Sequence, residues 1–263
     1  GCRTSGRQAR EARPAVFDVS DLPAIAAGKS LLAFCITEPD AGSDAGGVMT
    51  SAADCGDYYL PKGRQRFASG APMADYALVS ARTDPAQQGS RSISLFIADM
   101  KLSGIKCGAY EDKMGIRGYP TSDVSFKDVH VPKDCLIGPL HCGFAAAMKT
   151  LDGGRLGIAA QALGIAQACL DEAVTYARTR RQFGRTIGSF EGVSFMIADM
   201  ATELQAAREL VYSTAVLMDA GSPEVSVRCA MSKYYAAEMC NRAAYKAVQI
   251  FGGRGYIKGC RAE

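Results

Sequence analysis

Hydrophobic and polar positions follow two different periods along this chain. Between residues 30 and 132, apolar residues gather in short runs, some with alternation at every second position, separated by Gly and Pro. Such runs predict β-strands rather than helices. Several short strands at this spacing favour a small antiparallel barrel or sandwich. The expected strands cover residues 31–36, 76–81, 93–97, 124–126 and 129–132.

After residue 143 the period becomes helical. One apolar face repeats at alternating steps of three and four residues, through Phe190, Val193, Ile197, Met200, Leu204, Ala207 and Val211. Residues 144–180 and 224–251 are two further long helix candidates. Gly153 and Gly154 weaken the first of these by about 1 kcal/mol each relative to Ala. Three long amphipathic helices joined by short breaks predict most of a helical bundle.

The change of period divides the chain and predicts an α+β fold. We expect an antiparallel β-barrel or sandwich domain over residues 30–135, followed by an incomplete α-helical bundle over residues 136–263. Residues 1–29 form an atypical leader in which arginines recur at helical spacing. This leader is compatible with a disordered segment, with a misjoined start or with an organelle transit peptide.

Composition excludes several classes of protein. Of the 263 residues, 48% are hydrophobic and 22% are charged, which is ordinary for a globular protein and excludes global disorder. Lys and Arg number 30 against 27 Asp and Glu, and they are interspersed, whereas a nucleic-acid-binding protein concentrates basic residues on one face. No apolar run is long enough to predict a membrane span.

The cysteines do not predict a metal site. Ten are present, but none forms a C-x-x-C pair and the chain has only two histidines, so no zinc-binding spacing can be assembled. Reduced thiols in an intracellular protein are the simpler interpretation. A bacterial cytoplasm fits this interpretation, and a mitochondrial matrix is the alternative that the Arg-rich leader leaves open.

Five motifs carry the candidate chemistry. Taken singly, each is compatible with an ordinary hairpin, a Gly-containing helix, a helix cap or a terminal turn. The first runs from a strand into a turn of small and hydroxyl residues that presents backbone N–H groups to a polar ligand. The motifs cover residues 34–44, 113–118 (leading into 125–132), 151–157, 176–184 and 248–256.

In this order and spacing the motifs resemble the acyl-CoA dehydrogenases, over about residues 30–257. The stretch is similar to the middle and C-terminal parts of these FAD-dependent enzymes, and Gly154 before Arg155 is similar to the short-chain, butyryl type. The resemblance implies desaturation of a short- or medium-chain acyl-CoA to the trans-2-enoyl-CoA. It also implies electron transfer to electron-transfer flavoprotein and a homotetramer built as a dimer of dimers.

The resemblance places FAD contacts in both halves of the chain. In the first half, Thr37 and backbone amides would bind the pyrimidine edge of the flavin. Phe67-Ala68-Ser69 stands where most members have Trp-Ile-Thr, so that Phe67 would cover the ring and the Ser69 hydroxyl would reach flavin N5. Replacing Trp by Phe loses area and an N–H donor. The contacts implied in this half are Phe34, Cys35, Ile36, Thr37, Ser43, Phe67, Ala68 and Ser69.

In the second half, Arg180 would bind the FAD pyrophosphate, because its planar donors suit phosphate geometry. Phe183 would lie near the adenosine. Glu191 replaces the usual Gln of the family, although a carboxylate near a diphosphate is unfavourable. A neighbouring subunit's FAD would contact Gln249, Ile250, Phe251, Gly252 and Gly253, where glycine permits close backbone approach. The acyl-CoA contacts implied are Ser43, Asp152, Gly153, Gly154 and Arg155.

The family's catalytic base is not assigned to any residue of this chain. In the short-chain type it is a Glu in a Tyr-Glu-Gly-Thr turn, which the resemblance places beyond Glu263. Three alternatives therefore stay open: a catalytically dead FAD- or acyl-CoA-binding or assembly module, a truncated product without a stable fold, and an acyl-CoA oxidase.

Overall fold

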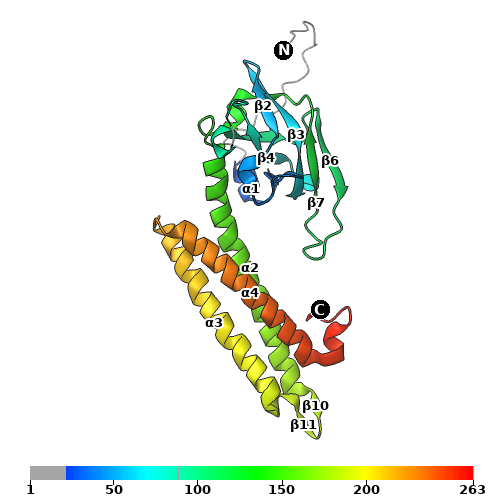
Figure 1. The fold of residues 1–263 in the computed structure, drawn as a ribbon. Helices are drawn as coiled ribbons and strands as arrows, with labels where there is room; N and C mark the ends of the chain where they lie inside the picture. The colour runs from blue at the N-terminus through cyan, green and yellow to red at the C-terminus, as the bar shows by residue number, and fades with distance from the viewer. Residues whose placement is uncertain (1–21, 88, 263) are drawn as a thin grey trace. The chain divides into compact units, whose positions relative to one another are not determined.

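A computed structural model describes residues 22–87 and 89–262 (Figure 1). The part of the leader up to residue 21 lies outside the described residues. The chain forms two compact units, one ending at Met148 and the other beginning at Lys149. Each unit has its own hydrophobic core, and the two are described separately.

The first unit is built on a mostly antiparallel sheet. It begins with the short helix α1 (Leu22–Ala26). The strands then follow in chain order: β1 (Leu32–Cys35), β2 (Ser51–Asp54), β3 (Tyr58–Ser69), β4 (Tyr76–Arg82), β5 (Ile93–Asp99), β6 (Ile105–Tyr110), β7 (Thr121–Phe126), β8 (Val131–Pro132) and β9 (Leu136–Ile137).

The strand order in this sheet is β6-β7-β3-β2-β4-β5-β9, with β1 beside β4 and β8 beside β3. Only the pairs β1–β4 and β2–β4 are parallel. A mostly antiparallel sheet followed by helices confirms the expected fold class. Within the described residues, however, the outermost strands β6 and β9 do not pair with each other, so the sheet is not a closed barrel.

Burial explains which strands the sequence revealed. Residues 93–98 of β5 are all buried and apolar or small, with Phe96 in the core beside Val79 of β4, and both strands were predicted. The longest strand, β3, was missed because its second half reads Lys-Gly-Arg-Gln-Arg. It forms nonetheless, because it pairs with β2, β7 and β8. Pairing along the whole strand therefore overrides its polar sequence.

The second unit contains the three predicted helices. Helix α2 (Gly143–Thr179) begins in the first unit, and α3 (Glu191–Asp219) and α4 (Val225–Phe251) follow. A small hairpin of β10 (Arg181–Gln182) and β11 (Arg185–Thr186) joins α2 to α3. On the predicted face of α3, the buried side chains are Met200, Leu204, Ala207 and Val211.

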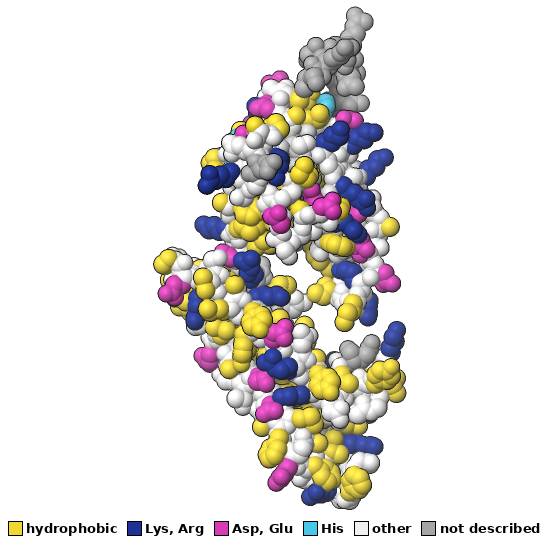
Figure 2. All heavy atoms as spheres, viewed as in Figure 1, with side chains coloured by type: hydrophobic (Ala, Val, Ile, Leu, Met, Phe, Trp, Pro, Cys, Tyr) yellow, Lys and Arg dark blue, Asp and Glu magenta, His cyan; other side chains and the backbone are white. Residues whose placement is uncertain are grey.

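Small residues fill much of the helical core, including Ala159, Ala166 and Ala173 of α2. Large apolar side chains also remain on its surface, where yellow spheres are scattered over the helices in Figure 2. No helix in the described part of the chain is long and apolar enough to cross a membrane. The most exposed apolar residues of α3 and α4 include Phe195, Tyr212, Val216, Tyr234 and Tyr245.

Two glycines of α2 should respond in opposite ways to Ala. A Cβ on Gly143 would lie 2.4 Å from the backbone nitrogen of Leu95, whereas a Cβ on Gly164 would meet no atom within 4 Å. Gly143→Ala should lower the free energy of unfolding by about 1–3 kcal/mol through overpacking. Gly164→Ala should raise it by up to about 1 kcal/mol through helix propensity. Urea unfolding of both variants measures the difference, and equal effects would contradict the packing of α2 against β5.

Candidate active site

The turn after β1 is anchored by a buried carboxylate. Glu38 accepts a hydrogen bond from the N–H of Met49 to Oε2 at 2.6 Å, and another from the N–H of Thr50 to Oε1 at 2.7 Å. Its own backbone forms a bridge with Ala41, with N···O distances of 3.0 and 3.2 Å. Because both carboxylate oxygens are used, the turn is held in place against the chain entering β2. Residues 37–43 are thereby presented on a fixed loop.

A bulge near the end of β3 sends Phe67 out of the sheet. The register between β3 and β7 shifts between Gln65 and Ala68, and Phe67 has φ 54°. Gln65 and Ala68 are both buried, whereas Phe67 is 54% exposed. A non-glycine residue in the left-handed region costs about 1–3 kcal/mol, and such strain is common at functional sites. The bulge therefore orients one aromatic ring outward at a cost that the surrounding structure must offset.

The anchored turn and the bulge lie side by side. The N–H of Arg66 donates to the backbone oxygen of Thr37 at 2.7 Å. Three residues later, Ser69 Oγ lies 3.1 Å from Thr121 Oγ1. That hydroxyl also accepts from Lys113 Nζ at 3.1 Å, so the second motif reaches the same place. The structure thus brings together Thr37, Phe67 and Ser69, which the resemblance implied for the flavin ring.

Some of the implied residues offer only backbone atoms. The side chains of Cys35 and Ala68 are fully buried in the core of the sheet. Burial, and then the proximity of Cys107, raises the pKa of the Cys35 thiol to about 12. The thiol is therefore neutral and inert at physiological pH. Phe34, Ile36 and Thr37 are half-buried and keep side-chain surface for a ligand.

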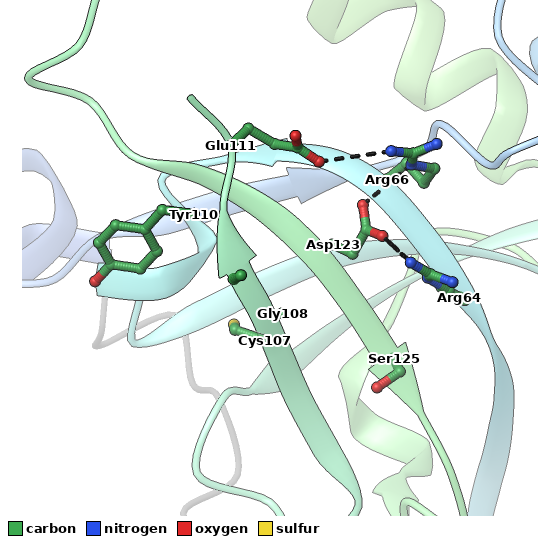
Figure 3. A pocket seen from close by; sticks show the side chains of 9 residues that line it. Arg64, Arg66, Cys107, Gly108, Tyr110, Glu111, Asp123 and Ser125 are labelled. Atoms are coloured by element: carbon green, nitrogen blue, oxygen red, sulfur yellow. Dashed lines mark hydrogen bonds and ion pairs between the residues drawn. The ribbon is translucent and has the colours of Figure 1, made fainter. Parts of the chain in front are cut away.

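A charged cluster lies beside the bulge, and sequence reasoning did not identify it (Figure 3). Arg66 Nε lies 3.3 Å from Asp123 Oδ1, and Arg66 Nη2 lies 3.5 Å from Glu111 Oε1. Arg64 Nε donates to Asp123 Oδ2 at 3.0 Å, and Arg64 Nη2 also contacts this oxygen. These side chains line an open hollow of about 530 Å³. Only the β3–β7 register places the two arginines against Asp123, so no local sequence signal marks the cluster.

The two arginines keep Asp123 ionised. Desolvation works in the opposite direction, but the hydrogen bonds and charge of Arg64, and then those of Arg66, hold the pKa of Asp123 below its ordinary value. Asp123 is mostly covered, with a side-chain exposure of 13%. The cluster is thus a fixed pairing of charges on β3, on β7 and at the residue after β6.

In the helical unit, the hairpin after α2 presents Arg180 and Phe183. The N–H of Arg180 donates to Tyr176 O at 2.8 Å, and Arg180 O accepts from the N–H of Ile187 at 2.9 Å. Phe183 has φ 52° and is 92% exposed at the hairpin turn. Its ring meets Phe190 edge-on at 6.0 Å, and Arg185 lies 4.1 Å over the Phe190 ring. The exposed guanidinium of Arg180 and the exposed ring of Phe183 are available to a phosphate and a base.

Glu191 stands where the resemblance implies Gln, and its position at the start of a helix gives a local reason for a carboxylate. It is the first residue of α3, and its side chain is exposed. A carboxylate in the first turn of a helix is favoured by the helix dipole. A Glu at position 191 therefore stabilises the start of α3, independently of its effect on a bound diphosphate.

At the end of α4, the backbone is sterically accessible to an external group. Gly252 has φ 61° and ψ −139°, a region that is essentially reserved for glycine, and a Cβ there or on Gly253 would meet nothing within 4 Å. Ile250 is buried, and Phe251 stacks on Tyr176 with centroids 4.4 Å apart. Within this stretch, the two glycines are the residues that an external group can approach most closely.

The implied acyl-CoA stretch is also structured. Asp152 Oδ1 accepts from Arg155 Nη1 at 2.5 Å and from Ser226 Oγ at 3.2 Å. Asp152 and Gly153 line a hollow of about 460 Å³ between α2 and the start of α4. Ser43 is exposed on the anchored turn of the other unit. In the described ranges, no group of three or more His, Cys, Asp and Glu could hold a metal ion.

Comparisons with known families match both units. The model of the acyl-CoA dehydrogenase middle domain matches residues 33–129, and that of the acyl-CoA dehydrogenase C-terminal domain matches residues 141–263. The chain is 52% identical over 242 residues to the caffeyl-CoA reductase–Etf complex subunit CarC of Acetobacterium woodii. That similarity covers 92% of this chain and 63% of the relative.

Two further relatives are covered by this chain to about the same share of their length. A 3-(aryl)acrylate reductase of Clostridium sporogenes is 49% identical, covering 90% of this chain and 62% of that protein. The butyryl-CoA dehydrogenase structure from Megasphaera elsdenii superposes with a TM-score of 0.90 at 41% identity, over 92% of this chain and 63% of that one. The chain therefore spans slightly less than two thirds of these relatives.

The Glu38 anchor can be tested by a substitution that keeps its shape. Glu38→Gln replaces one acceptor oxygen by an NH₂ donor that faces a backbone N–H. The free energy of unfolding should fall by about 1–3 kcal/mol, because a buried donor loses its partner. Asp40→Asn, at an exposed position of the same turn, is the control and should change it by less than about 0.5 kcal/mol. Chemical denaturation of both variants measures this; an equal effect would show that the anchor does not hold the turn.

Proposed function

Since the chain belongs to the acyl-CoA dehydrogenase family of FAD-dependent flavoproteins, we propose that it is the FAD-binding part of an enzyme that desaturates a short- or medium-chain acyl-CoA. The product would be the trans-2-enoyl-CoA. One observation carries this proposal: the 2.7 Å hydrogen bond from Arg66 N–H to Thr37 O, which joins two distant segments implied for the flavin ring.

The residues present fit the isoalloxazine. Phe67 is held outward in a strained conformation with more than half its surface exposed, which suits a ring that covers another ring. The Thr37 hydroxyl and nearby amides supply polar contacts, and Ser69 is a hydroxyl donor beside them. Bound FAD would supply the hydride acceptor. The chain's residues would hold the flavin, exclude water from one face and orient it.

The second unit fits the other end of the cofactor. Arg180 offers an exposed planar guanidinium, which suits a pyrophosphate, and Phe183 offers an exposed ring for the adenosine. The open glycines Gly252 and Gly253 would allow FAD of a neighbouring subunit to approach the backbone. For the thioester, we propose Ser43 and the stretch Asp152–Arg155. The exposed apolar residues on α3 and α4 support a homotetramer.

The reverse reaction is the second candidate, and the relatives favour it. CarC is named as part of a caffeyl-CoA reductase–Etf complex, and the second relative is named as an aryl-acrylate reductase. Reduction of a 2-enoyl thioester uses the same flavin and substrate geometry in the opposite direction. We also propose electron-transfer flavoprotein as the redox partner, in line with the name of the CarC complex. A bacterial cytoplasm is the compartment proposed, because the relatives named above come from bacteria.

FAD retention tests the site directly. The protein is soaked in FAD and desalted, and its visible spectrum is recorded; we expect a retained two-band flavin spectrum. Arg180→Ala should weaken FAD binding by roughly ten- to a hundredfold, since a hydrogen bond to a charged group contributes about 1.5–3 kcal/mol. Arg178→Ala removes an exposed arginine from the same helix end and should bind FAD like the parent chain. A colourless protein, or equal loss in both variants, would count against the site.

The direction of reaction is tested on the flavin-loaded protein. Bleaching of the flavin by butanoyl-CoA without oxygen would support desaturation. Reoxidation of the pre-reduced flavin by an aryl-acrylyl-CoA, with no bleaching by butanoyl-CoA, would support reduction. Flavin that is bound but responds to neither thioester would identify a binding module without turnover.

A further inference from the structure

The Phe67 ring is covered on one face by the side chain of its own neighbour. The guanidinium carbon of Arg66 lies 4.6 Å from the centroid of the Phe67 ring. A guanidinium within about 6 Å of an aromatic centroid is attracted by the electron-rich face of the ring. Because Phe67 is still 54% exposed, this contact leaves much of the ring surface free.

Arg66 is itself held from two other strands. Asp123 of β7 lies 3.3 Å from its Nε, and Glu111, which follows β6, lies 3.5 Å from its Nη2 (Figure 3). The backbone N–H of the same residue is fixed on Thr37 O. A planar side chain held at both edges has little rotational freedom, so its flat face can act as a support for the ring beside it.

We propose that Arg66 is a positioning residue, whose guanidinium, clamped between Asp123 and Glu111, holds the Phe67 ring so that its free face is presented to the flavin. This inference rests on the proposed function. In this proposal Arg66 acts through Phe67 and is not itself a contact of FAD or of the thioester. The charged cluster around Arg66 would then contribute to the flavin site indirectly, by fixing the orientation of Phe67.

Arg64 provides a matched control. Both arginines pair with Asp123, and both lie on the outer face of β3, but only Arg66 lies over the Phe67 ring. Arg66→Gln and Arg64→Gln each remove one positive charge beside the same carboxylate. A purely electrostatic or structural role of the cluster would make the two variants behave alike, whereas a role in orienting Phe67 would separate them.

The first measurement uses the protein without cofactor. The chain contains no Trp, so Phe67→Trp places its single tryptophan at the ring position, where it is excited selectively over the tyrosines. Adding Arg66→Gln to this reporter should lower its steady-state anisotropy and increase acrylamide quenching, and adding Arg64→Gln should change neither. Arg66→Lys should restore part of the anisotropy, because an ammonium can lie over the ring but lacks the planar fork that pairs with Asp123 and Glu111 from different edges. Cooperative melting of each variant shows that it is folded.

The second measurement uses FAD affinity in chains that keep Phe67. A cation–π contact at an exposed site corresponds to about a two- to fivefold change in population. The dissociation constant of FAD should rise by about that factor in Arg66→Gln and stay unchanged in Arg64→Gln. Equal anisotropy and equal affinity in the two variants would overturn the role of Arg66. A parent chain that binds no FAD would instead refute the proposed function, while the reporter would still decide whether Arg66 holds the ring.

Discussion

The hydrogen bond between Arg66 N–H and Thr37 O is the contact on which the site in the first unit depends. It joins the turn after β1 to the bulge of β3, although the two segments are far apart in the chain. On one side, the buried carboxylate of Glu38 holds the turn. On the other, the left-handed Phe67 keeps the bulge open. Neither element would place a ligand contact accurately without the other, because each fixes one edge of the same surface.

The strain at Phe67 needs several local compensations, and the structure supplies them. Gln65, just before the bulge, is buried and donates from Nε2 to Ser80 O at 2.8 Å. Ala68, just after it, is small enough to lie in the core. The guanidinium of Arg66 adds an attractive contact with the displaced ring. These interactions fix the residues that flank the strained position, which is the condition under which an unfavourable backbone conformation persists.

The periodicity of apolar residues was sufficient to predict the helices and the apolar strands. Helices α2 and α4 agree with the predicted ranges within one residue, and α3 carries the predicted apolar face, because long amphipathic repeats are strong signals. Strand β5 was equally clear because both of its faces are buried. Strand β3 was not found, since its charged second half is stabilised by pairing rather than by its own apolar content. The sequence of one strand does not show which strands pair with it. The order of strands in the sheet therefore could not be predicted from the sequence.

The candidate site shows the same division between local and non-local information. Thr37, Phe67 and Ser69 could be named from the family resemblance, and the structure brings them together in the first unit. Arg64, Arg66, Asp123 and Glu111 could not, because their pairing depends on the register of β3, β7 and β6. Arg66 is the link between the two sets: its backbone belongs to the bulge and its side chain to the charged cluster. The resemblance implies a larger aromatic ring at position 67, and the neighbouring Arg66 side chain can supply, by stacking, part of the support that the smaller Phe67 ring lacks.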